Sequence, residues 1–196
     1  MLRSFVIGLS FLLFQSLSAQ NNELGIRISY NTTENENEVS TSGATLTGYY
    51  TVKLGEKFAL EPSIQYRAQS FKDNVLEEYQ NVDVEYFSIP IALRYYPMNS
   101  KPFNDLYTFV GLQADLVIDA EIEDPSTGIR QDAHNIFNYV NGGYYYGLGY
   151  NIKQKVDVQL RWYQGLGNNY IEPQVSQTLD KNSFFEISMA FILFTE

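Results

Sequence analysis

The side chains best suited to chemistry in this chain are a single histidine and several carboxylates. His134 follows Asp132 closely, and it is the only histidine among the 196 residues. A histidine oriented by a carboxylate can act as a general base beside a nucleophile or a water molecule. No second anchoring residue accompanies this pair in its predicted loop, so we interpret His134 as a solvated loop residue. A hydrolase built around His134 is the weakest of the functional hypotheses.

A second group of candidates consists of carboxylates in predicted strands. Alternation places Asp115 and Asp119 on one strand face, and Asp157 and Glu186 lie in later strands. Paired carboxylates can serve acid–base chemistry, but the same faces carry three arginines: Arg67, Arg94 and Arg161. Arginine pairs with carboxylates through a planar fork, so we predict an enclosed salt-bridge network.

The remaining motif classes point away from an enzyme. The sequence has no zinc-ligand spacing, no phosphate-binding glycine loop and no calcium-loop pattern. It also has no cysteine, which excludes disulfides and thiolate metal sites. We therefore predict no catalytic, cofactor-binding or metal-ligating residues, and no cofactor.

Eight segments of alternating apolar and polar residues must position these side chains. Each is long enough for a membrane strand, which needs about 9–11 residues. The predicted strands are 23–32, 44–54, 57–71, 83–96, 105–121, 140–152, 155–166 and 184–194. The pattern predicts an all-β, eight-stranded antiparallel up-and-down transmembrane β-barrel.

Alternation alone fits either a soluble ligand-binding barrel or an inverted membrane barrel. In 57–71, for example, Leu60 and Ile64 oppose Glu61 and Arg67. The polar faces carry arginine and carboxylates but almost no lysine, which favours an enclosed lumen over a solvated surface. Aromatic residues near strand ends fit membrane-interface girdles. The candidates for these girdles are Tyr30, Tyr49, Tyr50, Tyr66, Tyr95, Tyr96, Tyr107, Tyr144, Tyr150, Trp162 and Tyr163.

The connections alternate in length along the chain. Short turns are predicted at 55–56, 97–104 and 153–154, and long loops at 33–43, 72–82, 122–139 and 167–183. Short turns of bacterial barrels are periplasmic and long loops extracellular, so we expect both termini in the periplasm.

Proline and glycine residues interrupt the predicted strands. Because proline removes a ladder donor, we expect bulges or rim positions at Pro62 and Pro90. Several glycines crowd two strands, and we expect them to seat neighbouring tyrosine rings. These glycines are Gly142, Gly143, Gly147, Gly149, Gly165 and Gly167.

The N-terminus has the pattern of a secretory signal. Arg3 precedes a short apolar run, 5–14, and Ala19 is a suitable small residue at a cleavage site. We therefore predict a signal peptide over 1–19 and a barrel domain over 20–196. The apolar run is too short for a spanning helix.

The acidic charge of the chain concentrates in predicted loops. The formal net charge is −10, and the stretches 31–42, 71–83 and 121–140 hold much of the acidic excess. Nucleic-acid recognition begins with a basic patch, so we expect no nucleic-acid partner. A solvated surface is the simpler interpretation of the loops, and bridging by divalent cations is the alternative.

Several segments resemble the PorT-like outer-membrane β-barrel family of Bacteroidetes-type bacteria. The resemblance rests on 58–66, 86–96, 106–112, 147–150 and 160–166, in that order. In 86–96 an Ile-Pro pair precedes an apolar run, a basic residue and paired aromatics. The resemblance implies an eight-stranded barrel in the outer membrane of a Gram-negative bacterium. The family's named member is linked to protein secretion across that membrane.

These observations favour a non-enzymatic outer-membrane protein that acts as an envelope scaffold with acidic extracellular loops. The alternative is an accessory component of an outer-membrane protein secretion complex, with a protein partner in the envelope. A soluble periplasmic ligand-binding barrel is the rival at the level of the fold. We expect outer-membrane lipid as the surrounding partner and a monomeric barrel.

Overall fold

The computed structural model describes residues 22–34, 40–75, 78–97, 105–124, 126–167 and 183–195. They form strands β1 (Glu23–Glu34), β2 (Ser40–Lys53), β3 (Phe58–Val75), β4 (Glu78–Tyr95), β5 (Leu106–Glu123), β6 (Arg130–Asp132), β7 (Val140–Ile152), β8 (Val156–Gly165) and β9 (Ser183–Thr195), with a 3₁₀ turn η2 (His134–Ile136). No helix in these ranges is long and apolar enough to cross a membrane. The predicted signal peptide, 1–19, lies outside the described residues.

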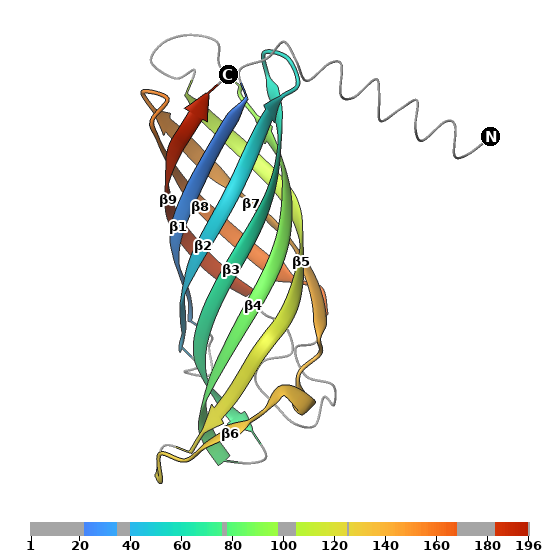
Figure 1. The fold of residues 1–196 in the computed structure, drawn as a ribbon, viewed down its shortest axis with the longest axis vertical. Helices are drawn as coiled ribbons and strands as arrows, with labels where there is room; N and C mark the ends of the chain where they lie inside the picture. The colour runs from blue at the N-terminus through green and yellow to red at the C-terminus, as the bar shows by residue number, and fades with distance from the viewer. Residues whose placement is uncertain are drawn as a thin grey trace, which may run out of the picture.

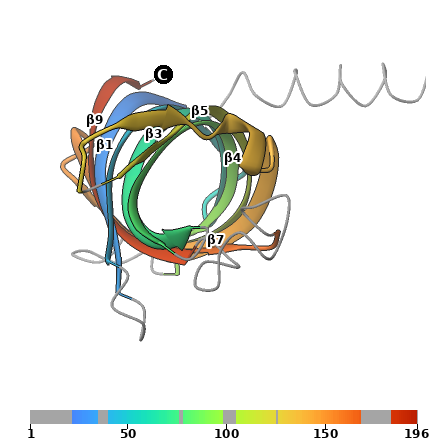
Figure 2. The same cartoon turned by 90° about the horizontal axis from the view of Figure 1, so that it is seen from below.

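Eight of the strands close into an antiparallel barrel. Each long strand pairs with the next along the chain, and β1 pairs with β9, which closes the ring. Figure 1 shows the tilted strands from the side, and Figure 2 shows the closed ring from below. The short β6 pairs only with the end of β5. The predicted eight-stranded barrel is confirmed.

The two ends of the barrel differ. Glu23 pairs with Thr195, so the described ends of the barrel sequence lie together. The β2–β3 and β7–β8 turns lie at this same end, which we call the turn end. In the β7–β8 turn, Lys153 and Gln154 have φ values of 53° and 56°, as a two-residue type I′ turn requires. The opposite end is the loop end.

The strand positions agree closely with the alternation, and β7 has the predicted bounds. The predicted long loop at 72–82 is wrong, because β3 and β4 stay paired as far as Val75 opposite Glu78. The polar residues of this stretch look like a loop in sequence, but they belong to a strand pair that continues beyond the apolar band. Neither β6 nor η2 was predicted.

The barrel wall is apolar outside and polar inside. Large apolar side chains on the outer face are 38–67% exposed, and the polar side chains of the inner face are buried. The outer set includes Leu60, Ile64, Phe87, Ile91, Val110, Leu112, Leu148, Leu160, Ile187 and Met189. The inner set includes Arg27, Glu61, Arg67, Arg94, Asp115, Asp157, Arg161 and Glu186.

The strand prolines do not produce the predicted bulges. The β3–β4 register is the same at Pro62 opposite Ile91 and at Gln65 opposite Ser88. Pro90 lies opposite Gln113 in an unshifted part of the β4–β5 ladder. The register shifts instead at Leu24/Gly25 and at Glu85/Tyr86. The expectation of bulges was wrong, because the barrel tolerates a locally interrupted ladder without inserting a residue.

Glycines of the wall receive the rings of lumen tyrosines, as predicted for Gly143 and Gly149. A side chain at Gly149 would collide with the Tyr107 ring, and one at Gly143 with the Tyr163 ring. Gly25 and Gly111 accommodate the rings of Tyr49 and Tyr145 in the same way. This packing lets large rings lie flat against the inner wall.

We expect Gly111→Ala to destabilise the barrel by about 1–3 kcal/mol, the usual cost of overpacking. A β-carbon there would lie 2.6 Å from the Ile91 carbonyl oxygen and would also meet the Tyr145 ring. Gly48→Ala is the matched control, since its nearest neighbour would be 3.7 Å away. Urea titration of the folded barrel measures both, and equal midpoints would contradict this packing.

Candidate functional site

The turn-end half of the lumen holds a cluster of two arginines and two carboxylates. Arg27 donates to both Glu61 carboxylate oxygens at 3.1 and 3.3 Å, and Arg94 also donates to Glu61. Asp157 lies 3.6 Å from a guanidinium nitrogen of each arginine. These side chains come from β1, β3, β4 and β8, so the cluster, which we call the turn-end cluster, ties opposite walls together.

Tyrosines surround this cluster inside the barrel. The Tyr107 hydroxyl donates to Asp157 at 2.5 Å, and Gln159 donates to Tyr107 at 2.7 Å. The guanidinium of Arg27 lies 4.5 Å from the Tyr49 ring centroid, and that of Arg94 lies 4.5 Å from the Tyr107 ring. Such cation–π contacts stabilise desolvated arginines.

The placement of tyrosines in interface girdles was wrong for part of the set. Tyr49, Tyr107 and Tyr163 are at most 2% exposed and face the lumen, and Tyr96 packs beside them. The others of the set lie on the outer face: Tyr30, Tyr50, Tyr66, Tyr95, Tyr144, Tyr150 and Trp162. The signal that separates the two groups is the alternation within each strand. Each inward tyrosine is an even number of residues away from the polar lumen residues of its own strand.

A second group of polar residues lies nearer the loop end, around Asp115. This carboxylate accepts hydrogen bonds from Ser88, from Gln113 at 2.7 Å and from Tyr163 at 2.7 Å. Arg67 lies 3.4 Å from its second oxygen. Separately, Arg161 donates to Glu186 at 2.8 Å beneath the Tyr145 ring.

The predicted lumen network is thus confirmed for Asp115, Asp157 and Glu186 with Arg67, Arg94 and Arg161. Sequence analysis missed Arg27, although it alternates with the apolar Ile26 and Ile28 in the first strand. The network places ion pairs across the interior of the barrel.

Asp119 departs from the prediction that it shares a face with Asp115. The β4–β5 register shifts between Glu85 and Tyr86, and Ile118 is the extra residue. The bulge reverses the alternation, so Val117 and Ala120 are buried while Ile118 and Asp119 are exposed. Asp119 therefore belongs to the outer surface, and the two aspartates do not form a pair.

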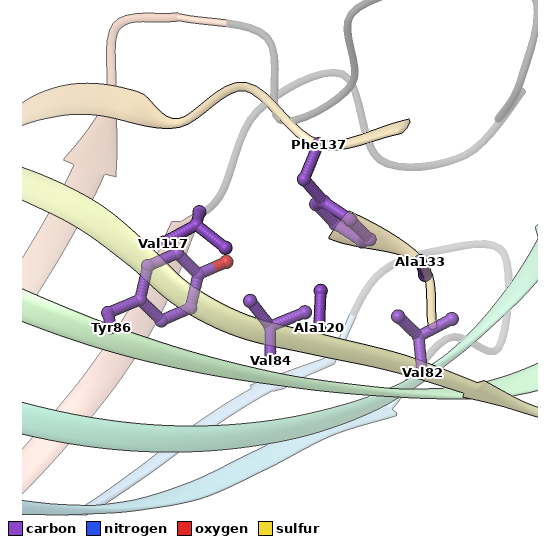
Figure 3. Packing of buried hydrophobic residues seen from close by; sticks show 7 residues of the cluster. All are labelled: Val82, Val84, Tyr86, Val117, Ala120, Ala133 and Phe137. Carbon is purple, nitrogen blue, oxygen red and sulfur yellow. The ribbon is translucent and has the colours of Figure 1, made fainter. Parts of the chain in front are cut away.

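Beyond this bulge the inward residues of β4 and β5 are apolar instead of polar. We call this part the extension: 68–75, 78–85, 119–123 and β6. Its inward residues on β4 and β5 are apolar and join residues of the β5–β7 connection in one cluster (Figure 3), whereas the inward Gln69 of β3 is polar. The cluster contains Val82, Val84, Tyr86, Val117, Ala120, Ala133 and Phe137. In Figure 1 the extension projects from the lower end of the barrel.

The outer face of the extension is acidic. In the β4–β5 register Glu85 lies opposite Asp119, and Asp83 lies opposite Glu121. Like charges directly opposite one another in a sheet repel. The four carboxylates and Arg130 line a shallow hollow of about 270 Å³. In the part of the chain that the structure describes, no group of three or more histidine or carboxylate side chains is arranged to hold a metal ion.

The hairpin that ends the extension is ordered by its own side chains. Hydrogen bonds from Ser126 and Thr127 lower the pKa of Asp124 to about 2. Arg130 donates to Glu121 at 3.1 Å and to Glu123 at 2.9 Å, and these bonds raise the pKa of the arginine. The Asp124 carboxylate is therefore charged at neutral pH.

His134 lies in η2, at the edge of the apolar cluster. Its backbone N–H donates to Asp132 at 2.9 Å, and its ring meets the Tyr139 ring edge-on with centroids 4.6 Å apart. The ring is thus an aromatic packing partner, and the carboxylate bonds the backbone instead of the imidazole. This geometry does not orient the ring for general-base chemistry.

Comparison with known proteins identifies the barrel. The model of the family described as outer membrane protein beta-barrel domain matches residues 8–170. The chain belongs to this family. Its outer apolar band is therefore the face toward membrane lipid, and the protein is located in the outer membrane.

Solved structures of other outer-membrane proteins resemble the chain at low sequence identity. The outer membrane enzyme PagL superimposes with a TM-score of 0.51 at 11% identity, over 84% of this chain and 98% of that chain. Neisserial surface protein A has a TM-score of 0.49 and 12% sequence identity, over 88% of this chain and 97% of that chain. Ail of Yersinia pestis has a TM-score of 0.46 and 12% sequence identity, over 88% of this chain and 97% of that chain. No curated protein matches the sequence significantly.

We expect this outer-membrane barrel to have negligible conductance. An eight-stranded barrel is just wide enough for its side chains to fill, and here the turn-end cluster crosses the lumen from four strands. Single-channel recording in planar bilayers tests this expectation. Large, stable openings would contradict it.

Proposed function

We propose that this outer-membrane barrel is a non-enzymatic envelope scaffold whose extension presents an acidic face outside the cell. The observation that carries the proposal is the continuation of the sheet beyond the bulge. In the extension the sheet continues beyond the bulge, and an apolar cluster packs against its inner side. Four carboxylates lie together on the outer side of the extension. A rigid, charged surface just beyond the lipid band suits a binding partner with complementary positive charge.

The proposed orientation puts both termini in the periplasm. It is supported by the short turns at the end where Glu23 pairs with Thr195, because short turns of bacterial barrels face the periplasm. The chain has no cysteine, so single Ile129→Cys and Leu54→Cys variants report on each end. In intact cells an impermeant maleimide should label the first variant and spare the second. The reverse pattern would overturn the orientation.

The scaffold role is tested by photo-crosslinking from the same two sites in cells. Ile129 and Leu54 are both exposed aliphatic residues, 57% and 50%, at opposite ends of the barrel. A photoreactive residue at Ile129 should capture a partner. Neutralising the hollow with Asp83→Asn, Glu85→Gln, Asp119→Asn and Glu121→Gln should abolish the crosslink. No crosslink, or one unaffected by neutralisation, would contradict the proposal.

The second candidate function is an accessory role in an outer-membrane secretion complex. It is supported by the resemblance of 86–96 and its neighbouring segments to the PorT-like family. This role predicts a stoichiometric protein partner after detergent extraction and crosslinking, captured from Leu54 at the turn end. Capture from Ile129 alone favours the scaffold.

A further inference from the structure

The outer wall of the barrel carries an open hollow of about 570 Å³ over β5, β7, β8 and β9. Its sides are the outward side chains Thr108, Tyr146, Leu148, Leu160, Trp162 and Phe185. Phe109, Gly147 and Arg161 complete the lining. The side chains of Phe109 and Arg161 are buried in the lumen, so the backbone of the wall forms the floor. The volume lies within the range of about 300–1,000 Å³ that is typical of small-molecule sites.

Two rows of outward side chains border the hollow. The strand register sets Thr108, Leu148 and Leu160 side by side in the first row, and Tyr146, Trp162 and Phe185 in the second. The short side chain of Thr108 leaves the first row low at its β5 end, whereas the second row is aromatic throughout. The hollow is therefore a groove that crosses the strands, with aromatic rings along one side.

The surface of this groove is almost entirely apolar. Arg161 is the charged residue of its lining, and its guanidinium donates to Glu186 inside the barrel. The strands beneath the groove are paired on both sides, since β7 lies between β5 and β8, and β8 lies between β7 and β9. The groove therefore offers neither an ion pair nor a free strand edge, and an occupant must be held by apolar contact.

The position of the groove decides which occupant fits, because its sides belong to the apolar band that faces membrane lipid. Protein segments associate within a membrane through close packing of small residues and through hydrogen bonds across the interface. This groove has bulky rings along one side and no free strand edge. A hydrocarbon chain is flexible enough to follow its floor. Such a chain gains dispersion contacts from the floor and both rows at once, whereas a flat part of the wall contacts it from one side.

We propose that this groove is a saturable binding site for an acyl chain of a membrane phospholipid. The chain lies between the two rows and packs along the rings of Tyr146, Trp162 and Phe185. The site differs from general contact with surrounding lipid, because the bound chain is held in preference to the hydrocarbon of a detergent. This inference is independent of the proposed scaffold role, since the groove lies on the lipid face and the acidic hollow lies on the extension.

The test uses Trp162, which is the only tryptophan of the sequence, lines the groove and is 40% exposed. Its fluorescence reports on the occupant without any label on the protein. The probe is a phospholipid brominated on its acyl chains, because bromine quenches tryptophan fluorescence on contact. The folded barrel is held in detergent micelles and titrated with this phospholipid at a constant excess of detergent. We expect the quenching to level off near an equimolar amount of phospholipid.

Thr108→Phe fills the low end of the groove and should remove the saturating part of the quenching. The matched control is Ala44→Phe, at an exposed position on the outer face of β2, which should keep it. Quenching that only rises in proportion to the lipid content of the micelles would overturn the proposal. So would a saturating signal that Thr108→Phe leaves unchanged, or no quenching of Trp162 at all, the result expected if a second copy of the chain covered the groove. If Thr108→Phe does not assemble, Leu148→Ala, which lowers the first row, should weaken the saturating signal, and an unchanged signal there would equally contradict the site.

Discussion

Ile91→Arg is expected to destabilise the inserted barrel by about 2–4 kcal/mol, the cost of arginine on the lipid face at the bilayer midplane. Ile91 is 48% exposed on the outer face of β4, among the apolar side chains of the band. Lipid offers the guanidinium neither water nor a carboxylate. Urea titration of barrels refolded into phospholipid vesicles measures the loss, and Leu160→Arg on β8 should behave alike.

Ile129→Arg is the matched control for this substitution. Ile129 is 57% exposed, but it lies in the hairpin of the extension, beyond the lipid band. The same exchange there should leave the urea midpoint and heat-modifiable gel migration unchanged. If Ile91→Arg and Leu160→Arg also assembled normally, the outer face could not be the lipid face.

Period-two alternation allowed most of the barrel to be predicted from the sequence. The pattern works within the lipid band because lipid requires apolar residues at every second position, while the lumen takes the polar ones. The soluble-barrel alternative could not be dismissed by alternation itself, since the inverse barrel has the same period. The structure and the family resolve it, because polar side chains such as Arg94 and Glu61 are the buried ones.

The errors come from features that do not repeat with period two. One extra residue, Ile118, reverses the faces of β5, so counting from Asp115 placed Asp119 on the wrong side. The stretch 72–82 is rich in polar residues, which made a strand pair resemble a loop. The inward tyrosines are a different kind of error, because parity within their own strands already places Tyr49, Tyr107 and Tyr163 with the buried polar residues.

Arg94→Met is expected to cost about 3–5 kcal/mol, the range for removing one partner of a buried ion pair. Methionine keeps much of the apolar stem volume, so the loss reports on charge. Glu61 and Asp157 would then share Arg27 as their remaining cationic partner. A guanidinium nitrogen of Arg27 lies 3.6 Å from an Asp157 carboxylate oxygen. Urea titration in vesicles measures the effect, and adding Glu61→Gln should recover part of the loss, because it removes one uncompensated buried charge.

Arg130→Met removes an arginine that also contacts two carboxylates, Glu121 and Glu123. The Arg130 side chain is 58% exposed, whereas that of Arg94 is 1% exposed. Water and salt screen the exposed pairs, so this variant should unfold at the wild-type urea midpoint. Equal losses for the two variants would mean that the lumen screens charge as solvent does. A loss confined to Arg94→Met would show that an unpaired charge inside the barrel is not screened as it is at the surface.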